Sequence, residues 1–589
     1  MERKTPSGGG VPTRSIVRFG VFELDLRAAE LRKNGRRIRL QEQPFQILLE
    51  LLEQPGQVVL REEIRKKLWP NDTFVEFDSS INSAVKRLRD SLQDSAEKPR
   101  YIETLSRRGY RFIAPVSRES NDARPAESDA SIAVLPFANL GGNLENEYFS
   151  DGLAEDIINE LMRVPGLKVI ARTSAFAFKG KQEDVRTIAS ALGVANILEG
   201  SVRRTGTQVR ITTQLIAARD GTHLWSERYD RDMSDIFVIQ NEIAKAIASA
   251  LRVQLTETST QYVPQLPAYE AYLKARYCLA ALTHESLPRS RDYYEQAIAM
   301  DAAFAPARSG LAMALVSLVL TGIIAARVAL PLARAAAIRA LEIDPSSQEA
   351  RAVLGMVAAL HDFDWKEAER QFGLAMAREP VSAYVRWYYS FSYLLPMGRT
   401  RESVRQCMRG LQDDPLNFIG WFHHACGLLA GGNVEDGEAR LRQLSESHPD
   451  LYQPYYLLAL SQTLRGLHKA ALTSAEKAYC LAPWSTTTRG LLAGLLKCTG
   501  AASRGDELVH DLLPGDRYGT AMGLTFFHAG CSEIEQAACW AERAIQQRDT
   551  RIILFVGLLR AFRPEVLCQD ARWSGMVGEL SIPLLGLDD

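Results

Sequence analysis

The sequence predicts a multidomain protein in which an α+β module is followed by an α/β module and then by an all-α solenoid. Its 589 residues are too many for one hydrophobic core and suit about three to five folding units. Strand-like and helical spacings of apolar residues alternate over residues 16–255, and prolines recur at a nearly constant spacing in the last part. A content of 46% apolar and 24% charged residues excludes disordered, collagen-like and mucin-like chains.

Two polar stretches divide the chain. Residues 117–130 (SRESNDARPAESDA) hold no apolar side chain larger than alanine, and residues 256–267 (TETSTQYVPQLP) form a second break. The expected parts are a first module over 16–116, a linker over 117–130, a second module over 131–255, a solenoid over 268–550 and a C-terminal capping segment over 551–589.

The net charge of −1 is unevenly distributed. Residues 1–118 contain 23 Lys and Arg against 16 Asp and Glu, a net of +7, which leaves 47 against 55, a net of −8, in the rest. A basic module on an acidic body predicts that the N-terminal part alone faces a polyanion.

The cysteines and the N-terminus indicate a reducing, cytoplasmic location. All eight cysteines lie between Cys278 and Cys568 and none has CxxC spacing, which disfavours a disulfide framework or a structural zinc site. The N-terminal MERKTPSGGGVPTRS has no apolar segment of the kind that a secretory signal needs. We expect no metal and no other cofactor.

Residues 16–116 begin as short strands and continue as helices. Alternating residues over 16–40 surround an Asn34-Gly35 turn, and helical spacing follows over 45–52 and 61–69. A third helix is expected to begin at Asp78 or Ser79. Residues 101–105 and 110–113 read as a hairpin with Ser106, Arg107, Arg108 and Gly109 at its tip.

The third helix has an apolar and a polar face. Its apolar positions recur at helical spacing and are expected to face the core: Ile81, Val85, Leu88 and Leu92. The opposite face carries Ser83, Lys86, Arg87 and Asp90, with Arg89 on the flank. Such a helix and a hairpin with arginines at its tip suit double-stranded DNA, because the helix fits the major groove and the hairpin reaches the minor groove. The alternative is a solvated basic face beside an ordinary hairpin.

The segments FGVFELD, INSAVKRLRDSL and TLSRRGYRFIAPV, with residues 40–69, resemble the winged helix-turn-helix effector domain of OmpR/PhoB transcription factors. The resemblance covers nearly all of residues 16–116. It implies that Ser83 and Arg87 face bases and that Lys86 and Arg89 face phosphates. It implies wing contacts by Arg107, Arg108 and Tyr110, and a contact of the Trp69 to Phe77 loop with RNA polymerase.

Residues 131–255 alternate between strands and helices, which predicts an α/β fold. Strands are expected at 131–137, 167–170, 195–202, 208–217 and 224–229, and helices at 147–163, 185–192 and 236–247. SIAVLPFANL, EYFSDGLAEDI, LEGSVRR and WSERYDRD resemble the TolB amino-terminal-like domain. That domain accompanies helix-turn-helix modules or cyclase domains ahead of tetratricopeptide arrays in bacterial regulators.

The last part of the chain repeats with a period of 34 to 35 residues. The prolines that mark the period are Pro345, Pro380, Pro415, Pro449 and Pro483. Small residues recur ten residues after the first four: Gly355, Ser390, Ala425 and Ala459. Stacked helix pairs need small side chains where their axes approach, and a proline that ends the second helix. The pattern resembles the tetratricopeptide repeat and predicts about eight units.

One uncharged stretch competes with this interpretation. Residues 309–326 hold no charge over 18 residues, which just reaches the length of a membrane-spanning helix. The stretch is rich in Ala, Gly and Ser and is flanked by repeats in register. We therefore expect a buried solenoid helix and no membrane contact, with a membrane span as the alternative.

No enzyme motif is found, since GxxxxGK[ST], GxGxxG, HExxH and GxSxG are absent. The adjacent His423 and His424 are interpreted as surface or packed histidines rather than metal ligands.

These observations predict a bacterial, cytoplasmic DNA-binding transcriptional regulator and no catalytic residues. The winged helix would bind a promoter, while the other modules sense a signal or bind a partner protein. The alternatives are a tetratricopeptide scaffold tethered non-specifically to DNA and, third, an enzyme in residues 131–255.

Overall fold

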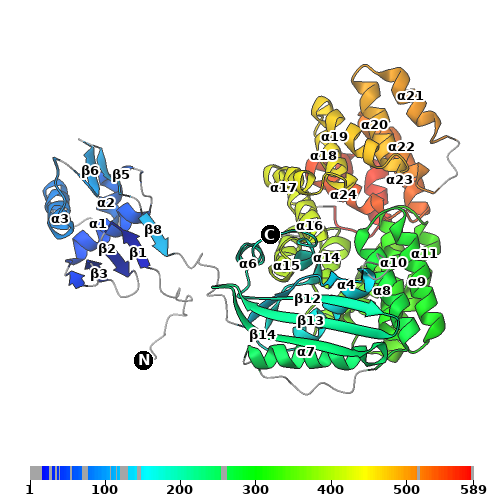
Figure 1. Cartoon of the computed structure of the whole chain (residues 1–589). Coiled ribbons are helices and arrows are strands. Elements are labelled where there is room, and N and C mark those ends of the chain that lie inside the picture. Colours follow the sequence, from blue (N-terminus) through cyan, green and yellow to red (C-terminus); the bar gives the residue numbers. More distant parts are fainter. Residues whose placement is uncertain are drawn as a thin grey trace, which may run out of the picture. The chain divides into compact units, whose positions relative to one another are not determined.

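The computed structural model divides the chain into two compact units, Met1–Glu127 and Ser128–Asp589 (Figure 1). The residues described are 16–20, 22–25, 30–33, 36–38, 40–53, 56, 58–68, 77–97, 99–105, 108–114, 116–119, 130–141, 147–251, 253, 262–513 and 518–584.

The first unit combines two antiparallel sheets with three helices in its described part. The larger sheet has the order β4-β3-β2-β1-β8 and consists of β1 (Ile16–Phe19), β2 (Phe22–Asp25), β3 (Glu30–Lys33), β4 (Arg36–Ile38) and β8 (Val116–Glu119). The smaller sheet has the order β5-β7-β6, with β5 (Val58–Leu60), β6 (Ile102–Leu105) and β7 (Gly109–Phe112). The helices are α1 (Glu42–Glu53), α2 (Arg61–Leu68) and α3 (Phe77–Leu92).

The core of this unit follows the apolar periodicity of the sequence. Alternate residues of the strands, such as Phe22 and Leu24, are buried against helix residues such as Leu48 and Leu88. Strand β8 was not expected: it pairs with β1, so the first four residues after Pro115 extend the unit into the predicted linker. The Asn34-Gly35 turn and residues 120–129 lie outside the described residues.

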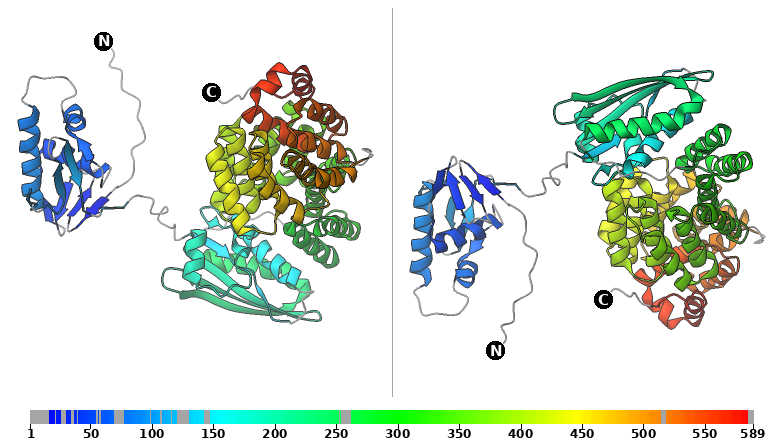
Figure 2. Two further views of the ribbon diagram at one scale, coloured as in Figure 1. Left: turned by 90° about the horizontal axis from the view of Figure 1, so that it is seen from above. Right: turned by 90° about the horizontal axis from the view of Figure 1, so that it is seen from below.

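The second unit begins with a mixed sheet of order β11-β9-β12-β13-β14, in which β10 also pairs with β12. The strands are β9 (Ser131–Val134), β10 (Ala138–Asn139), β11 (Lys168–Val169), β12 (Asn196–Thr205), β13 (Gln208–Ala217) and β14 (Thr222–Asp232). The helices are α4 (Glu147–Met162), α5 (Arg172–Phe176), α6 (Val185–Leu192) and α7 (Ile236–Ala250). Helices α4 and α7 cover one face of the sheet, and α5 and α6 cover the other (Figure 2).

A long helical region follows, and its described part contains eight consecutive helix pairs. The pairs are α8 (Leu266–Ala281) with α9 (Ser286–Met300), α10 (Ala305–Leu320) with α11 (Ala326–Ile343), α12 (Gln348–Val357) with α13 (Trp365–Ala375), α14 (Ala383–Tyr389) with α15 (Thr400–Asp413), α16 (Phe418–Ala430) with α17 (Val434–Ser447), α18 (Tyr452–Leu464) with α19 (His468–Leu481), α20 (Thr486–Cys498) with α21 (Ala502–His510), and α22 (Thr520–Gly530) with α23 (Ile534–Gln546).

Small residues lie where the helices approach each other, as the repeat predicts. A Cβ atom on Gly355 would lie 2.8 Å from the Phe372 ring, and the fully buried Ser390 bonds Ser403 of the next helix at 2.7 Å. The uncharged residues 309–326 form most of α10 and the turn after it, and α10 packs against α9, α11 and α12. Among the described helices, none has the length and hydropathy needed to cross a membrane.

The α/β part and the helical region share one hydrophobic core, although the sequence places a break between them. Tyr269 and Leu273 of α8 and Tyr294 of α9 are buried together with residues of α4 and α7. The approach of α4 to α8 is close, because a Cβ on Gly152 would lie 2.5 Å from a Leu273 methyl carbon. The two parts therefore form a single folding unit.

The C-terminal helices α24 (Arg551–Phe562), α25 (Pro564–Gln569) and α26 (Ala571–Glu579) return to the middle of the array. Helix α24 packs against α16 and α18, which belong to the inner layer formed by the first helices of the pairs (Figure 1). The buried Arg560 donates hydrogen bonds to the carbonyls of Leu395 at 2.9 Å and Pro396 at 3.0 Å. The segment expected to cap the end of the solenoid thus also fills part of its inner surface.

Candidate functional site

Helix α3 presents a polar face to solvent because its apolar positions are held in the core. Ile81, Val85 and Leu88 are at most 1% exposed and pack against α1 and α2. The exposed positions are Asn82, Ser83, Lys86, Arg87 and Asp90. The sequence predicts this division correctly for Ser83, Lys86 and Arg87, and it omits Asn82.

Arg87 projects from the exposed face, and its side chain bonds a residue close to the start of α1. Its Nη1 atom donates a hydrogen bond to Gln41 Oε1, just before α1, at 2.6 Å. This contact uses one end of a guanidinium group that has five N–H donors. The remaining donors suit a planar, bidentate acceptor such as the edge of a base.

Arg89 does not lie where the sequence predicts. The residue is 9% exposed, and its Nη2 atom donates hydrogen bonds to the Ile102 carbonyl at 2.6 Å and to Thr104 Oγ1 at 2.8 Å. Both acceptors belong to β6, so Arg89 ties α3 to the hairpin. Its flank position on the helix faces protein here, and a structural role replaces the predicted phosphate contact.

Tyr110 is also buried, whereas the resemblance implies a wing contact for it. It is 2% exposed, and its hydroxyl donates to Asn82 Oδ1 at 2.9 Å. Arg61 Nη2 donates to the same Asn82 oxygen at 2.9 Å and to the Tyr110 hydroxyl at 3.1 Å, with the guanidinium 5.3 Å from the Tyr110 ring centre. This network links the first turn of α2 to α3 and β7. Tyr110 therefore supports the surface rather than extending from the hairpin.

The hairpin of β6 and β7 stands beside α3, and Arg108 at its tip is exposed. Gly109 is required by close packing, because a Cβ atom there would lie 1.9 Å from the Val59 carbonyl oxygen. Ser106, Arg107 and the loop residues 69–76 lie outside the described residues. The candidate surface thus consists of Ser83, Lys86, Arg87 and Arg108, with Asn82 as an addition.

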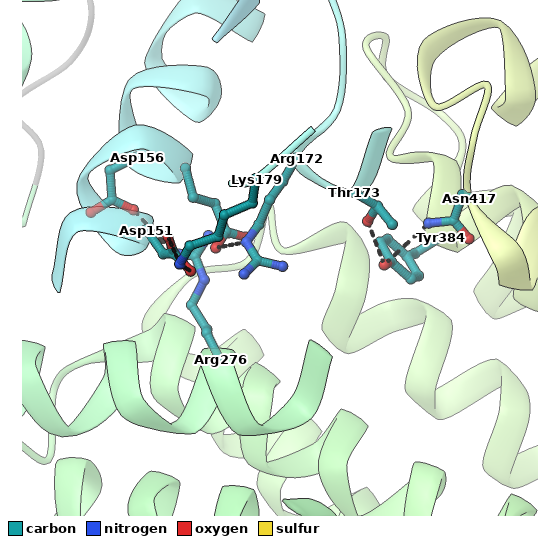
Figure 3. Close-up of polar contacts among 9 residues, drawn as sticks. Asp151, Asp156, Arg172, Thr173, Lys179, Arg276, Tyr384 and Asn417 are labelled. Carbon is teal, nitrogen blue, oxygen red and sulfur yellow. Dashed lines mark hydrogen bonds and ion pairs between the residues drawn. The ribbon is translucent and has the colours of Figure 1, made fainter. Parts of the chain in front are cut away.

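A second polar cluster joins α4 and α5 to the helical region (Figure 3). Arg276 of α8 contacts Asp156 at 2.9 Å and also pairs with Glu155, while the Tyr269 hydroxyl bonds Asp156. Burial raises the pKa of the Asp156 carboxyl, and Arg276 opposes that shift. Lys179 closes the cluster on the other side through Asp151 at 2.7 Å. Apart from Lys179, whose side chain is 37% exposed, these charges are largely removed from water, and all are paired, which is typical of a structural joint.

A neighbouring joint connects α5 to the turn between α15 and α16. The Ser174 amide and hydroxyl both bond the buried Asp414 carboxylate, and the Thr173 hydroxyl lies 3.3 Å from the Tyr384 hydroxyl (Figure 3). Asn417 Nδ2 also bonds Asp414, at 2.8 Å. Helix α5 was not expected from the sequence, so neither was this joint.

His423 and His424 on α16 are packed histidines. They are 6% and 8% exposed, and His423 Nδ1 lies 3.2 Å from the Trp387 carbonyl. Burial lowers the pKa of His423 to about 3 and that of His424 to about 4. Within the described residues, no group of three or more His, Cys, Asp or Glu side chains could hold a metal ion.

Comparison with known families gives two matches. Residues 35–112 match the family described as transcriptional regulatory protein, C terminal. Residues 128–246 match the second domain of HilA/YgeH-like transcriptional regulators. The likeness supported for the α/β part is therefore to HilA-type regulators.

The similar individual proteins include a HilA regulator and a protein named as an adenylate cyclase. The Salmonella typhimurium "Transcriptional regulator HilA" is 24% identical over 404 residues, which are 67% of this chain and 70% of that protein. The Rhizobium meliloti protein named "Putative adenylate cyclase 3" is 37% identical over 273 residues, 45% of this chain and 44% of that protein. This chain thus matches less than half the length of the latter relative.

Among solved structures, the Klebsiella pneumoniae RstA DNA-binding domain in complex with the RstA box is 30% identical. The match covers 17% of this chain and 96% of the RstA chain, with a TM-score of 0.16. The chain therefore combines a winged helix-turn-helix domain of OmpR/PhoB type, a HilA-like second domain and a tetratricopeptide-like helical region.

Proposed function

We propose that this protein is a cytoplasmic transcriptional regulator whose first unit binds double-stranded promoter DNA. The observation that carries the proposal is the polar face of α3, where Ser83, Lys86 and Arg87 are exposed while the opposite face is fully buried. A helix of this kind can enter the major groove without rearrangement of its core. The exposed Arg108 beside it suits a phosphate or the minor groove.

Base reading is assigned to Arg87 and Ser83, and phosphate contact to Lys86 and Arg108. The resemblance to OmpR/PhoB factors implies a wing contact for Arg107. The same resemblance assigns the Trp69 to Phe77 loop to RNA polymerase. These roles place base contacts on α3, and phosphate contacts on Lys86 of the same helix and on the hairpin.

For the second unit, we propose signal reception or partner binding. The joints around Arg276 and Asp414 support movement of the α/β part and the array as one body. A partner of the array would have to use a surface other than the inner one covered by α24, or displace that helix. The HilA and TolB-like resemblances favour a regulatory rather than a catalytic role for residues 131–255.

The competing function is a protein scaffold tethered to DNA without sequence preference. The eight helix pairs favour it, since such arrays commonly present extended binding surfaces. Genome-wide mapping and footprinting of the intact chain separate the two functions. A defined promoter footprint supports the regulator, and salt-sensitive binding without preferred sites supports the scaffold.

A matched pair of variants sharpens the footprinting experiment. Lys86→Ala combined with Arg87→Ala should abolish the footprint. Arg37→Ala should preserve it, because Arg37 lies on β4 in the other sheet and pairs with Glu30 at 3.1 Å. An unchanged footprint for the α3 double variant, with the fold intact by circular dichroism, would place DNA recognition elsewhere.

A further inference from the structure

Strand β14 forms a long edge of the sheet in the second unit. It runs for 11 residues, Thr222–Asp232, and pairs with β13 along one side. Within the described residues, no strand pairs with its other side (Figure 2). Tyr229 is buried under the sheet, whereas most side chains on the strand are exposed. A long exposed edge of this kind is a template for another strand.

The direction of the backbone groups on β14 follows from one hydrogen bond at its end. The Met233 amide donates to the Thr207 carbonyl at 2.7 Å, which continues the register of Gln208 with Asp232. In an antiparallel ladder, alternate residues direct their N–H and C=O groups to the same side. Residues 231, 229 and 227 therefore direct these groups toward β13. The residues that direct them to the open side are Ser226, Arg228, Asp230 and Asp232.

We propose that the β14 strands of two copies of this chain pair antiparallel about a twofold axis at Tyr229. The two sheets then form one continuous sheet. The pairing sets Arg228 of one copy opposite Asp230 of the other, and both residues direct their backbone groups outward, as a hydrogen-bonded pair requires. The occupant of this edge is thus a second copy of the same strand, in an isologous interface.

The charges of β14 select this register. With the axis at Tyr229, every charged residue from 227 to 231 faces an opposite charge: Glu227 faces Arg231, and Arg228 faces Asp230. An axis at Arg228 or Asp230 would set two like charges opposite each other. An axis at Glu227 or Arg231 would do the same. Like charges directly opposite are destabilising in a sheet, so among the axes at residues 227 to 231 only the one at Tyr229 avoids them.

The conformation of the separate chain already suits this arrangement. Asp230 contacts Arg210 of β13 at 2.5 Å and Arg228 at 3.1 Å, which orders the three side chains on the outer face. Hydrogen bonds from Arg210 lower the pKa of the Asp230 carboxyl, so it is charged at neutral pH. A second Arg228 placed opposite Asp230 would continue the alternation of charge.

The pairing stops at two copies. The opposite edge of the sheet, β11, is two residues long, and the chain just after it bonds the helical region through the Ala171 amide and the Asp413 carbonyl at 2.8 Å. No comparable free edge remains for a third copy in the described part of the sheet. A closed dimer is therefore expected rather than a fibre.

Glu227 and Arg231 offer a direct test. They are four residues apart on one strand, roughly 13 Å, so they meet only between copies. Sedimentation of the full chain at several concentrations should show a dimer. Glu227→Arg and Arg231→Glu, each alone, should raise its dissociation constant by about tenfold or more, because two opposite-charge pairs become like-charge pairs. The double charge swap should return the constant to within about threefold of the original value.

A second variant tests the backbone. Ser226→Pro removes an amide that points to the open side and leaves the ladder with β13 intact, so it should weaken the dimer with little change in melting temperature. Three results would overturn the proposal: a chain that stays monomeric at all concentrations, single variants that dimerise normally, or a charge swap that restores nothing. Each result is read on variants whose circular dichroism matches that of the original chain.

Discussion

Arginine serves opposite purposes in the two units of this chain. On α3, Arg87 is exposed and donates a hydrogen bond to the neutral side-chain amide of Gln41. On α8, the Arg276 side chain is 12% exposed and contacts two carboxylates. The first is accessible to an anionic or polar ligand, whereas the second is committed to the fold. Burial therefore decides whether a cation belongs to a binding surface or to a structural joint, and residue type alone does not.

The largest effect is expected for Arg276→Ala. This change leaves the largely buried Asp156 without its cation and Glu155 with Arg172 alone, at 3.0 Å, so the free energy of unfolding of the second unit should fall by about 3 to 5 kcal/mol. Urea titration of the full chain measures it. The control is Arg339→Ala, whose partner is Glu342 on the surface of α11 and whose loss should cost about 1 kcal/mol or less. Equal losses for both variants would show that the cluster is not a joint.

Acidification should destabilise the second unit through His423 and His424. Both have folded-state pKa values of about 3 to 4, below the ordinary 6.5, so the unfolded chain binds more protons between those values. Stability is therefore retained above pH 6.5 and lost as the pH falls below it, by about 2 kcal/mol per histidine between pH 7 and pH 5.

The measurement is the difference in unfolding free energy between pH 7 and pH 5. Replacing both histidines by glutamine should reduce this difference. His510→Gln, on the exposed end of α21, should not. A pH dependence that is the same in the double variant and the original chain would contradict the role given to these histidines.

Arg89→Ala should destabilise the first unit. The change removes two charge-assisted hydrogen bonds to β6, and the expected loss is about 1.5 to 3 kcal/mol of unfolding free energy. Thermal unfolding followed by circular dichroism measures it. Arg87→Ala on the same helix is the matched control and should change the melting temperature little. A fully stable Arg89→Ala protein with reduced affinity for all DNA would restore the predicted phosphate contact.

Local periodicity predicts much of this structure. The spacing of apolar residues predicts α3, α4, α6 and α7 close to their observed bounds. The predicted strand at Gln208–Ala217 coincides with β13. The polar face of α3 was also predictable, because 100° per residue separates Arg87 from the core stripe. The side chain of a flank residue such as Arg89 can point to solvent or to protein. The strand that Arg89 contacts begins 13 residues further along the chain, so helical spacing alone does not decide between the two.

Contacts between distant segments were not predictable. The bond from Trp365 Nε1 to the Leu580 carbonyl, at 2.7 Å, depends on the curvature of the whole array, which accumulates from small rotations between repeats. The joint at Asp414 depends on α5, a five-residue helix too short to give a periodic signal. Tyr110 has the residue type of a wing contact, but its ring faces Arg61 instead.

Arg87→Ala should change DNA specificity with little change in stability, which completes the comparison within α3. The guanidinium is exposed, and its hydrogen bond to Gln41 leaves donors that can bond a guanine edge. We expect a loss of about 1 to 3 kcal/mol on the specific site and little loss on random DNA. Lys86→Ala, the matched phosphate contact, should weaken both DNAs about equally and lower the magnitude of the salt slope by roughly one unit. The comparison uses titrations at matched salt. Equal losses on both DNAs for Arg87→Ala would make it a phosphate contact and move base reading to Ser83, Asn82 or the hairpin.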